Sequence, residues 1–189
     1  GWLVEALVAV QNQHRVVFEV IREDQSRTAE RLRRGEVMAA ITAEPRPVPG
    51  CRVVRLGRLR YVAVSTPMFR ARHFADGVNA TSLVAAPVVA FDRDDTLQHD
   101  FIRKICRRHL APATNYIPSV REFDEAVRRG MGWGMMLERE AASDLAAERL
   151  VELVPGRHSD VSLYWQHWRL GSSAMSDLTD AVVHAAKAW

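Results

Sequence analysis

Polar side chains follow several apolar runs of the sequence, at positions where a buried strand would end. They are Asp24, Thr42, Glu44, Asp92 and Ser119. In open α/β sheets, ligands bind outside the carboxyl ends of parallel strands, where helix N-termini offer free N–H groups. A carboxylate can hold an ammonium or guanidinium group there, and a hydroxyl can donate to a carboxylate. These five residues are therefore candidate ligand contacts.

Each candidate also has an ordinary structural interpretation. Asp92 is suited to a turn, and Thr42 and Glu44 are suited to a loop end. Ser119 precedes Glu122 by three residues, which is the spacing of a capping box at a helix N-terminus. Either role would explain these residue types without a ligand.

Two aromatic residues, Trp165 and Trp168, lie in an alternating run near the C-terminal end. Their rings could stack on an aliphatic or guanidinium stem of a ligand. Aromatic residues in such a strand are also typical of a core. Trp165 is included among the candidate site residues, with the core as its alternative.

Motifs that carry catalysis are missing from the sequence. It contains no GxSxG, HExxH or Walker loop, and its seven His residues are scattered. The run Gly130-Met131-Gly132-Trp133-Gly134 follows a predicted helix and precedes a predicted strand, which is the reverse of a dinucleotide fingerprint. It fits a helix end and a tight turn. Cys51 and Cys106 have no metal-type spacing and should be free thiols. We expect no enzyme activity, cofactor or metal.

Composition indicates a soluble globular chain. At 189 residues with 48% hydrophobic residues, it can form one large domain or two small ones. Its apolar runs are far shorter than a membrane span, so we expect no membrane contact and a cytoplasmic location. The formal charge of +3 is dispersed. The Arg-rich stretch 27–34 is interleaved with Glu, so an exposed helix face is favoured over a DNA-contacting patch.

The first predicted α/β unit spans residues 16–42. It consists of a β-branched strand at 16–21, a helix of about ten residues and a second strand at 38–41. A crossover through one short helix makes the two strands parallel. An amphipathic helix at 2–10 precedes this unit. Because a helix that opens a parallel α/β domain normally follows a strand, we expect that strand before residue 1 in a longer protein.

A second unit of the same type follows residue 87. A buried strand at 87–91 is followed by a helix with Asp95 and Gln98 in the spacing of a capping box, then by a strand at 115–120. Two long alternating strands, at 52–65 and 161–168, flank this region. They predict a discontinuous first lobe of residues 1–64 and 165–189, and an inserted second lobe of residues 65–164, with a cleft between the lobes.

The pattern resembles the effector-binding domain of LysR-type transcriptional regulators. Three segments carry the resemblance: residues 31–41 (RLRRGEVMAAI), residues 59–65 (LRYVAVS), and the helix, Gly-x-Gly and strand passage at 123–137. Within that family, the sequence most resembles the ArgP/LysG branch at residues 23–37, 86–92 and 163–165. That branch regulates export of lysine and arginine. Met38 and Leu137 depart from the wider family, which usually has Asp and Pro at these positions.

The resemblance implies a fold and a function. The fold is α/β, with two Rossmann-like lobes joined by two crossing strands, similar to type II periplasmic binding proteins. Lysine or arginine would bind in the interlobe cleft and control transcription of an amino-acid exporter gene. Operator DNA would be bound only by a winged helix-turn-helix domain that is absent from this chain. A homodimer or homotetramer is implied, with residues 2–21 in the dimer contact.

One alternative from another class shares the two lobes. A free-standing solute-binding protein of an amino-acid transporter would have the same fold and cleft. An upstream helix-turn-helix would support the regulator, whereas a signal peptide would support the transporter component.

Overall fold

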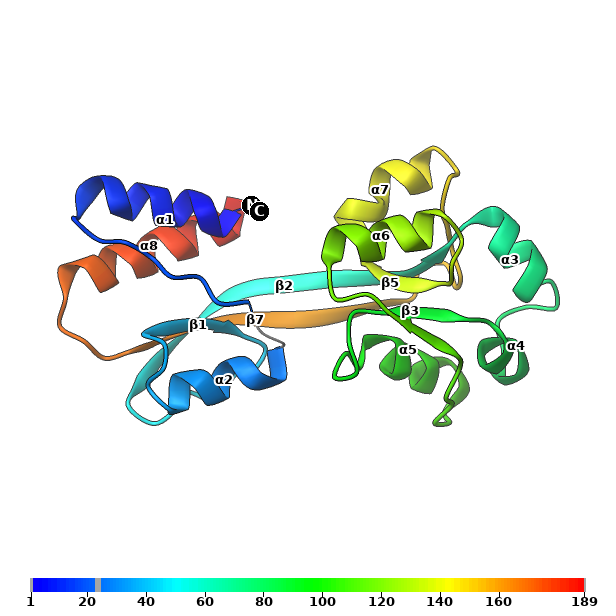
Figure 1. The fold of residues 1–189 in the computed structure, drawn as a ribbon, viewed down its shortest axis with the longest axis horizontal. Helices are drawn as coiled ribbons and strands as arrows, with labels where there is room; N and C mark the ends of the chain where they lie inside the picture. The colour runs from blue at the N-terminus through cyan, green and yellow to red at the C-terminus, as the bar shows by residue number, and fades with distance from the viewer. Residues whose placement is uncertain (1, 23–24, 189) are drawn as a thin grey trace. The chain divides into compact units, whose positions relative to one another are not determined.

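The computed structural model describes residues 2–22 and 25–188 and divides into two compact units (Figure 1). Unit 1 comprises residues 1–59 and 161–189, and unit 2 comprises residues 60–160. The lobe boundaries expected from the sequence, after residue 64 and before residue 165, lie a few residues later in the chain than these.

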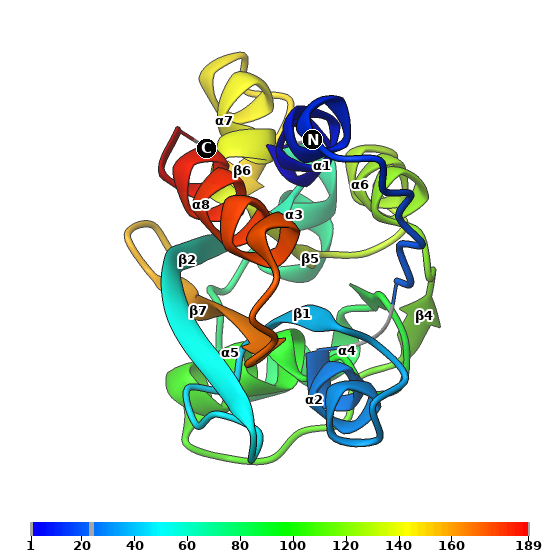
Figure 2. The ribbon, with the colours of Figure 1, turned by 90° about the vertical axis from the view of Figure 1, so that its left-hand side faces the viewer.

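Unit 1 holds the two ends of the described chain. Its elements are α1 (Trp2–Gln13), α2 (Gln25–Arg33), β1 (Ala39–Thr42), the first part of β2 (Cys51–Ser65), the last part of β7 (His158–Trp168) and α8 (Ser173–Ala188). β1 pairs antiparallel with β7, and the strand order is β1, β7, β2. α1 and α8 cover one face of β1, and α2 covers the other face (Figure 2).

The packing of α1 against α8 follows from their apolar stripes. Ala6 and Val10 of α1 are buried against Leu178, Val182 and Ala185 of α8. These residues recur every three to four positions, so each helix presents one apolar face. The amphipathic helix predicted at residues 2–10 is confirmed, and it extends to Gln13.

The predicted strand at 16–21 is wrong as a sheet member. Residues 16–22 have no strand assignment, and residues 17–21 make no backbone hydrogen bond to any described residue. The predicted parallel pairing is therefore not formed, and β1 pairs only with β7 among the described strands. Val17 and Val20 are 89% and 62% exposed, which is unusual for β-branched residues in an apolar run.

Unit 2 contains the remaining helices and strands. They are α3 (Pro67–His73), α4 (Ala80–Ala85), β3 (Val88–Ala90), α5 (Leu97–Cys106), β4 (Thr114–Tyr116), α6 (Val120–Arg128), β5 (Gly134–Leu137), α7 (Glu138–Ala146) and β6 (Val151–Glu152). β3 and β4 are parallel with α5 as their crossover, so the second predicted βαβ unit is confirmed. β5 and β6 pair antiparallel with β2.

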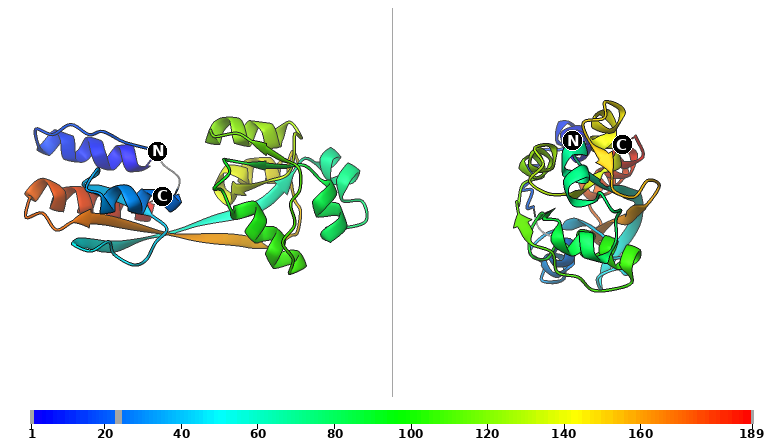
Figure 3. Two further views of the ribbon diagram at one scale, coloured as in Figure 1. Left: turned by 60° about the horizontal axis from the view of Figure 1, so that its bottom comes forward. Right: turned by 90° about the vertical axis from the view of Figure 1, so that its right-hand side faces the viewer.

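Two strands, β2 and β7, pass from one unit into the other (Figure 3, left). Both strands were predicted from their alternating sequences. Within unit 2, Arg60 at the start of that unit donates through Nε to Asp160 Oδ1 at its end, over 3.0 Å. This pair joins the two strands where they enter unit 2.

The Gly-rich passage after α6 is a helix end followed by a close backbone approach. Gly130 has φ +74°, the left-handed conformation that commonly ends helices. A Cβ on Gly132 would lie 2.9 Å from the carbonyl oxygen of Pro87 and 3.1 Å from the carbonyl carbon of Val88. Gly132 therefore lets the chain pass directly beside β3, and the interpretation as a turn is confirmed.

Candidate ligand-binding site

Asp92 and Ser119 lie at the same edge of unit 2. Asp92 follows β3 by two residues, and Ser119 follows β4 by three residues. The two strands are parallel, and the backbone N–H of Ile117 donates to the carbonyl oxygen of Ala90 over 2.9 Å. The carboxyl ends of both strands therefore meet, as expected for a ligand site in an α/β sheet.

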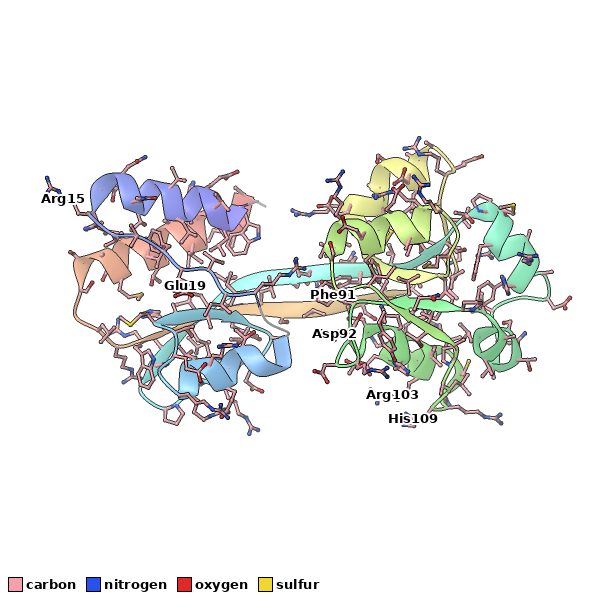
Figure 4. The ribbon with its side chains drawn as sticks, viewed as in Figure 1. Arg15, Glu19, Phe91, Asp92, Arg103 and His109 are labelled. Carbon is pink, nitrogen blue, oxygen red and sulfur yellow. The ribbon has the colours of Figure 1, made fainter. Side chains whose placement is uncertain are left out.

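Asp92 closes a turn with one carboxylate oxygen only. Its Oδ1 accepts hydrogen bonds from the backbone N–H groups of Asp94 (2.9 Å) and Asp95 (3.0 Å). Within the described part of the chain, Oδ2 has no donor. The side chain is half-buried and lies at the tip of β3 (Figure 4). Asp92 thus has the structural role considered for it, and it keeps an oxygen that could accept from a ligand cation.

Asp95 anchors the segment between β3 and α5. Its Oδ2 accepts from Phe91 N (2.9 Å) and from Gln98 Nε2 (3.1 Å), and its Oδ1 accepts from Leu97 N (3.1 Å). The predicted capping box is wrong, because Gln98 bonds to the Asp95 carboxylate and to the carbonyl oxygen of Val89 rather than to the Asp95 backbone. This network fixes the position of the strand end that carries Asp92.

Ser119 is the N-cap residue of α6, but it does not form a capping box. Its side chain makes no hydrogen bond to the helix backbone; instead, the hydroxyl contacts the carboxylate of Glu122. Among the described residues, no acceptor is found for the backbone N–H groups of residues 120–122. These groups and the positive end of the helix dipole are suited to binding an anion.

Tyr61 is a residue near this edge that sequence reasoning missed. Burial, together with the negative charge of Asp95, raises the pKa of its phenol to about 12. The phenol therefore stays neutral at physiological pH and lies close to the Asp95 carboxylate. Its position in the predicted crossing strand was the only sequence signal, because an alternating strand gives every second side chain to the same face.

In unit 1, Thr42 is a structural residue. It is 1% exposed, and its hydroxyl donates to the Glu44 carbonyl oxygen over 3.2 Å. The same oxygen accepts from Glu44 N (3.1 Å) and from Gln166 Nε2 (3.3 Å). Glu44 in turn uses Oε1 to accept from the backbone N–H of Arg46 over 3.1 Å. Thr42 therefore has internal partners for its whole hydrogen-bonding capacity.

Gln166 holds the Pro-rich loop at residues 44–50 and was also missed. The side chain is fully buried on β7. Its Oε1 accepts from Val48 N over 2.9 Å, and its Nε2 donates to the carbonyl oxygens of Glu44 (2.9 Å) and Arg46 (3.1 Å). A loop with three prolines has few backbone donors, so a side chain supplies its hydrogen bonds. A single amide side chain in the alternating strand, next to Trp165, was the available signal.

Trp165 belongs to the core of unit 1. It is 5% exposed and packs within the cluster that joins α1 and α8. Its indole N–H donates to Thr179 Oγ1 over 3.1 Å, so the polar atom is also paired. The alternative considered for Trp165, a core role, accounts for all of these contacts. Asp24, the remaining candidate, lies outside the described residues.

Two further findings concern the described residues 2–22 and 25–188. No group of three or more His, Cys, Asp or Glu side chains is arranged there to hold a metal ion. None of the helices in these ranges combines the length and apolar character needed to cross a membrane.

Comparison with known proteins gives one family. The profile described as LysR substrate binding domain matches residues 1–187. The HTH-type transcriptional regulator LysG of Mycobacterium tuberculosis is 44% identical over 171 residues, which are 90% of this chain and 56% of that protein. The lysine export transcriptional regulatory protein LysG of Corynebacterium efficiens is 40% identical over 188 residues, which are 99% of this chain and 64% of that protein. The chain thus spans about 60% of the length of these relatives.

A solved structure agrees with the sequence relatives. Full-length LysG from Corynebacterium glutamicum with bound effector Arg superposes with a TM-score of 0.86 at 37% identity, covering 98% of this chain and 63% of that chain. The predicted fold class, two α/β lobes joined by two crossing strands as in type II periplasmic binding proteins, is confirmed. The proteins named in these comparisons are transcriptional regulators rather than enzymes.

Proposed function

Because the chain belongs to the family of LysR substrate-binding domains, we propose that it senses a basic amino acid, lysine or arginine, for a transcriptional regulator. The chain is the effector domain of a LysR-type regulator of the LysG/ArgP group and is not an enzyme. The identity of the effector is the proposed part.

One observation carries the choice of effector. The C. glutamicum LysG structure has arginine bound as effector, and the match at 37% identity covers 98% of this chain and 63% of that one. A basic amino acid has a carboxylate, an α-ammonium group and a distal cation. A site for it must combine N–H or O–H donors with carboxylate acceptors.

The edge of unit 2 offers both kinds of group. Asp92 Oδ2 can accept from an ammonium or guanidinium group, and the free N–H groups at the start of α6 can donate to a carboxylate. The Ser119 hydroxyl could join them only by giving up its hydrogen bond to Glu122. Tyr61 adds a neutral hydroxyl. Thr42, Glu44 and Trp165 support the proposal less, because each has internal partners. Asp24 stays a prediction.

The proposal also includes the role of the full-length regulator in transcription. The regulator would bind operator DNA through a winged helix-turn-helix domain, act in the cytoplasm as a dimer or tetramer, and control an exporter gene. The name of the C. efficiens relative, a lysine export regulatory protein, supports this role. The named relatives favour a regulator over the alternative of a solute-binding protein of a transporter.

Isothermal titration calorimetry on the polypeptide of the complete reading frame tests the proposal. We expect saturable heat with L-lysine or L-arginine and none with L-leucine, an apolar amino acid that has no distal cation. Absence of heat with lysine, arginine and histidine, from protein shown to be folded by circular dichroism, would reject a basic effector. Equal binding of leucine would reject recognition of the distal cation.

A further inference from the structure

Two polar side-chain atoms in the core of unit 2 have no hydrogen-bond partner among the described residues. They are the indole nitrogen Nε1 of Trp133, which can only donate, and the amide oxygen Oε1 of Gln98, which can only accept. The Trp133 side chain is fully buried, and Gln98 is 1% exposed. Buried polar groups of folded proteins are nearly always hydrogen-bonded, so each of these two atoms needs a partner.

Both side chains lie where α5 packs on β3 (Figure 1). Trp133 is held beside β3 by its backbone: its N–H donates to the Pro87 carbonyl oxygen over 3.2 Å, and its carbonyl oxygen accepts from Val89 N over 2.8 Å. Gln98 Nε2 donates to the carbonyl oxygen of the same Val89 over 3.1 Å. Phe101, three residues after Gln98 on α5, has its ring centroid 5.7 Å from that of Trp133. The unpaired donor and the unpaired acceptor therefore belong to one small region of the core.

The other hydrogen bonds of the Gln98 amide fix its orientation. Nε2 donates to two acceptors, the Val89 carbonyl oxygen and Asp95 Oδ2, each over 3.1 Å. A rotation that exchanged the amide nitrogen and oxygen would place Oε1 against these two acceptors and would lose both bonds. The Trp133 ring packs against Phe101 inside the core, so its N–H group cannot reach solvent either. Neither atom can find a partner by turning its side chain outward.

We infer that one water molecule is bound between these two side chains. It accepts a hydrogen bond from Trp133 Nε1–H and donates one to Gln98 Oε1. Water fits this pair because it is both a donor and an acceptor and is small enough for a close-packed core. An ion would not fit, since the indole N–H repels a cation and the amide oxygen repels an anion.

This water extends a network that reaches the ligand-binding edge of unit 2. Gln98 donates to Asp95 Oδ2, and the same oxygen accepts from Phe91 N over 2.9 Å, directly before Asp92. The bridge to Trp133 links this network to the Gly-rich passage that precedes β5. The end of β3 is thus connected through side chains to α5 on one side and to that passage on the other. The inference concerns the core of unit 2 and does not depend on the identity of the effector.

A crystal structure of the complete polypeptide, at a resolution that shows ordered water, tests the inference directly. We expect one water oxygen about 2.7–3.2 Å from both Trp133 Nε1 and Gln98 Oε1. A direct hydrogen bond between the two side chains, with no water, would overturn the inference. So would a water that contacts only one of the two atoms, or a dry contact that leaves both atoms without a partner.

Nuclear magnetic resonance tests the same inference in solution. A long-lived internal water gives a cross-relaxation peak with the Trp133 indole proton, whose signal is identified by its loss in Trp133→Phe. We expect this peak in the wild type and in Gln13→Met, which changes an exposed amide on α1. We expect its loss in Gln98→Met, which removes the acceptor.

Two results of this experiment would contradict the bound water. One is the absence of the peak from the wild type, which decides the question even if Gln98→Met does not fold. The other is a peak of unchanged intensity in folded Gln98→Met, because the water would then be held by other groups.

Discussion

The strand ends of the two units use their polar groups differently. In unit 1, Thr42 and Gln166 bond to each other and to the loop that follows β1. In unit 2, Asp92 keeps one carboxylate oxygen free, and the first N–H groups of α6 have no acceptor among the described residues. The same sequence signal, a polar residue after an apolar run, therefore has two outcomes. In unit 1, Thr42 joins Gln166 in a clamp, the pair of side chains that holds the loop by hydrogen bonds. In unit 2, the signal marks groups that are available for binding.

The difference depends on the segment that follows each strand. The loop after β1 contains three prolines and is irregular, so it takes hydrogen bonds from side chains. The segments after β3 and β4 lead into helices α5 and α6, and the first N–H groups of a helix have no partner within the helix itself. This contrast can be tested by substitutions that separate stability from ligand affinity.

The largest expected effect is on the clamp in unit 1. Gln166→Leu leaves Val48 N–H and the carbonyl oxygens of Glu44 and Arg46 without their partner in a buried site. We expect the free energy of unfolding to fall by about 3 kcal/mol or more. Urea denaturation measures it, with the exposed Gln13→Leu as the matched control. A loss no larger than that of the control would show that Gln166 is not a clamp.

A smaller effect is expected on affinity in unit 2. Asp92→Asn keeps the turn acceptor Oδ1 but removes the negative charge. We expect binding of the basic amino acid to weaken by about 10- to 100-fold with Tm almost unchanged, because charged hydrogen bonds contribute about 1.5–3 kcal/mol. Calorimetry compares this variant with Asp76→Asn, an exposed carboxylate of the same unit. Wild-type affinity of the Asp92→Asn variant would show that Asp92 does not contribute to ligand binding.

Thr42→Val tests the structural role of the polar groups in unit 1. The substitution removes a buried hydroxyl that makes three hydrogen bonds, two with the Glu44 backbone and one with Gln166, and keeps the shape of the side chain. We expect a loss of about 1 kcal/mol in unfolding free energy and no change in ligand affinity. An affinity loss with unchanged stability would move Thr42 from the structural group to the binding site.

The smallest effect concerns pH. Asp144 is 5% exposed, and the hydrogen bond from Arg128, with a second from Arg149, lowers the pKa of its carboxyl group. Its ionised form therefore stabilises the fold above the unfolded pKa of about 3.9, and this contribution is lost as pH falls through the lower folded pKa. Asp124 opposes this trend, because burial raises the pKa of its carboxyl group and favours the protonated form.

Thermal unfolding of Asp144→Asn and wild type between pH 7 and pH 2 measures that contribution. We expect the difference in stability to shrink at the acid end by under about 1 kcal/mol, since Arg149 is 63% exposed and its pair is screened by solvent. A difference that grows at low pH would mean that the ionised form of Asp144 does not stabilise the fold.

Much of the fold could be predicted because its elements have strong local patterns. The stripes of α1 and α8, the long alternation of β2 and β7, and the parallel β3 and β4 with α5 between them all follow from periodicity. Helix α3 was not predicted. It begins with Thr66, whose hydroxyl caps Phe69 N over 3.2 Å, and Pro67 at the first helical position, but its polar sequence is typical of a loop.

The candidate site could be predicted only in part. A strand end locates Asp92 and Ser119, but the sequence does not say which oxygen of Asp92 is used by the turn. The roles of Gln166 and Tyr61 depend on residues over 100 and 30 positions away, respectively, so only the folded chain brings them to their partners. The segment 16–22 has the composition of a strand, but a strand also needs a neighbour to pair with.

The Gln166 clamp also determines the alignment of β7 on β1. A shift of β7 by one residue would turn every side chain of the strand to the opposite face and remove the amide from the loop. Because the amide reaches residues 42, 44, 46 and 48, such a misaligned strand would leave several polar groups unpaired at once. One side chain thus discriminates between the correct strand alignment and its nearest competitors while unit 1 folds.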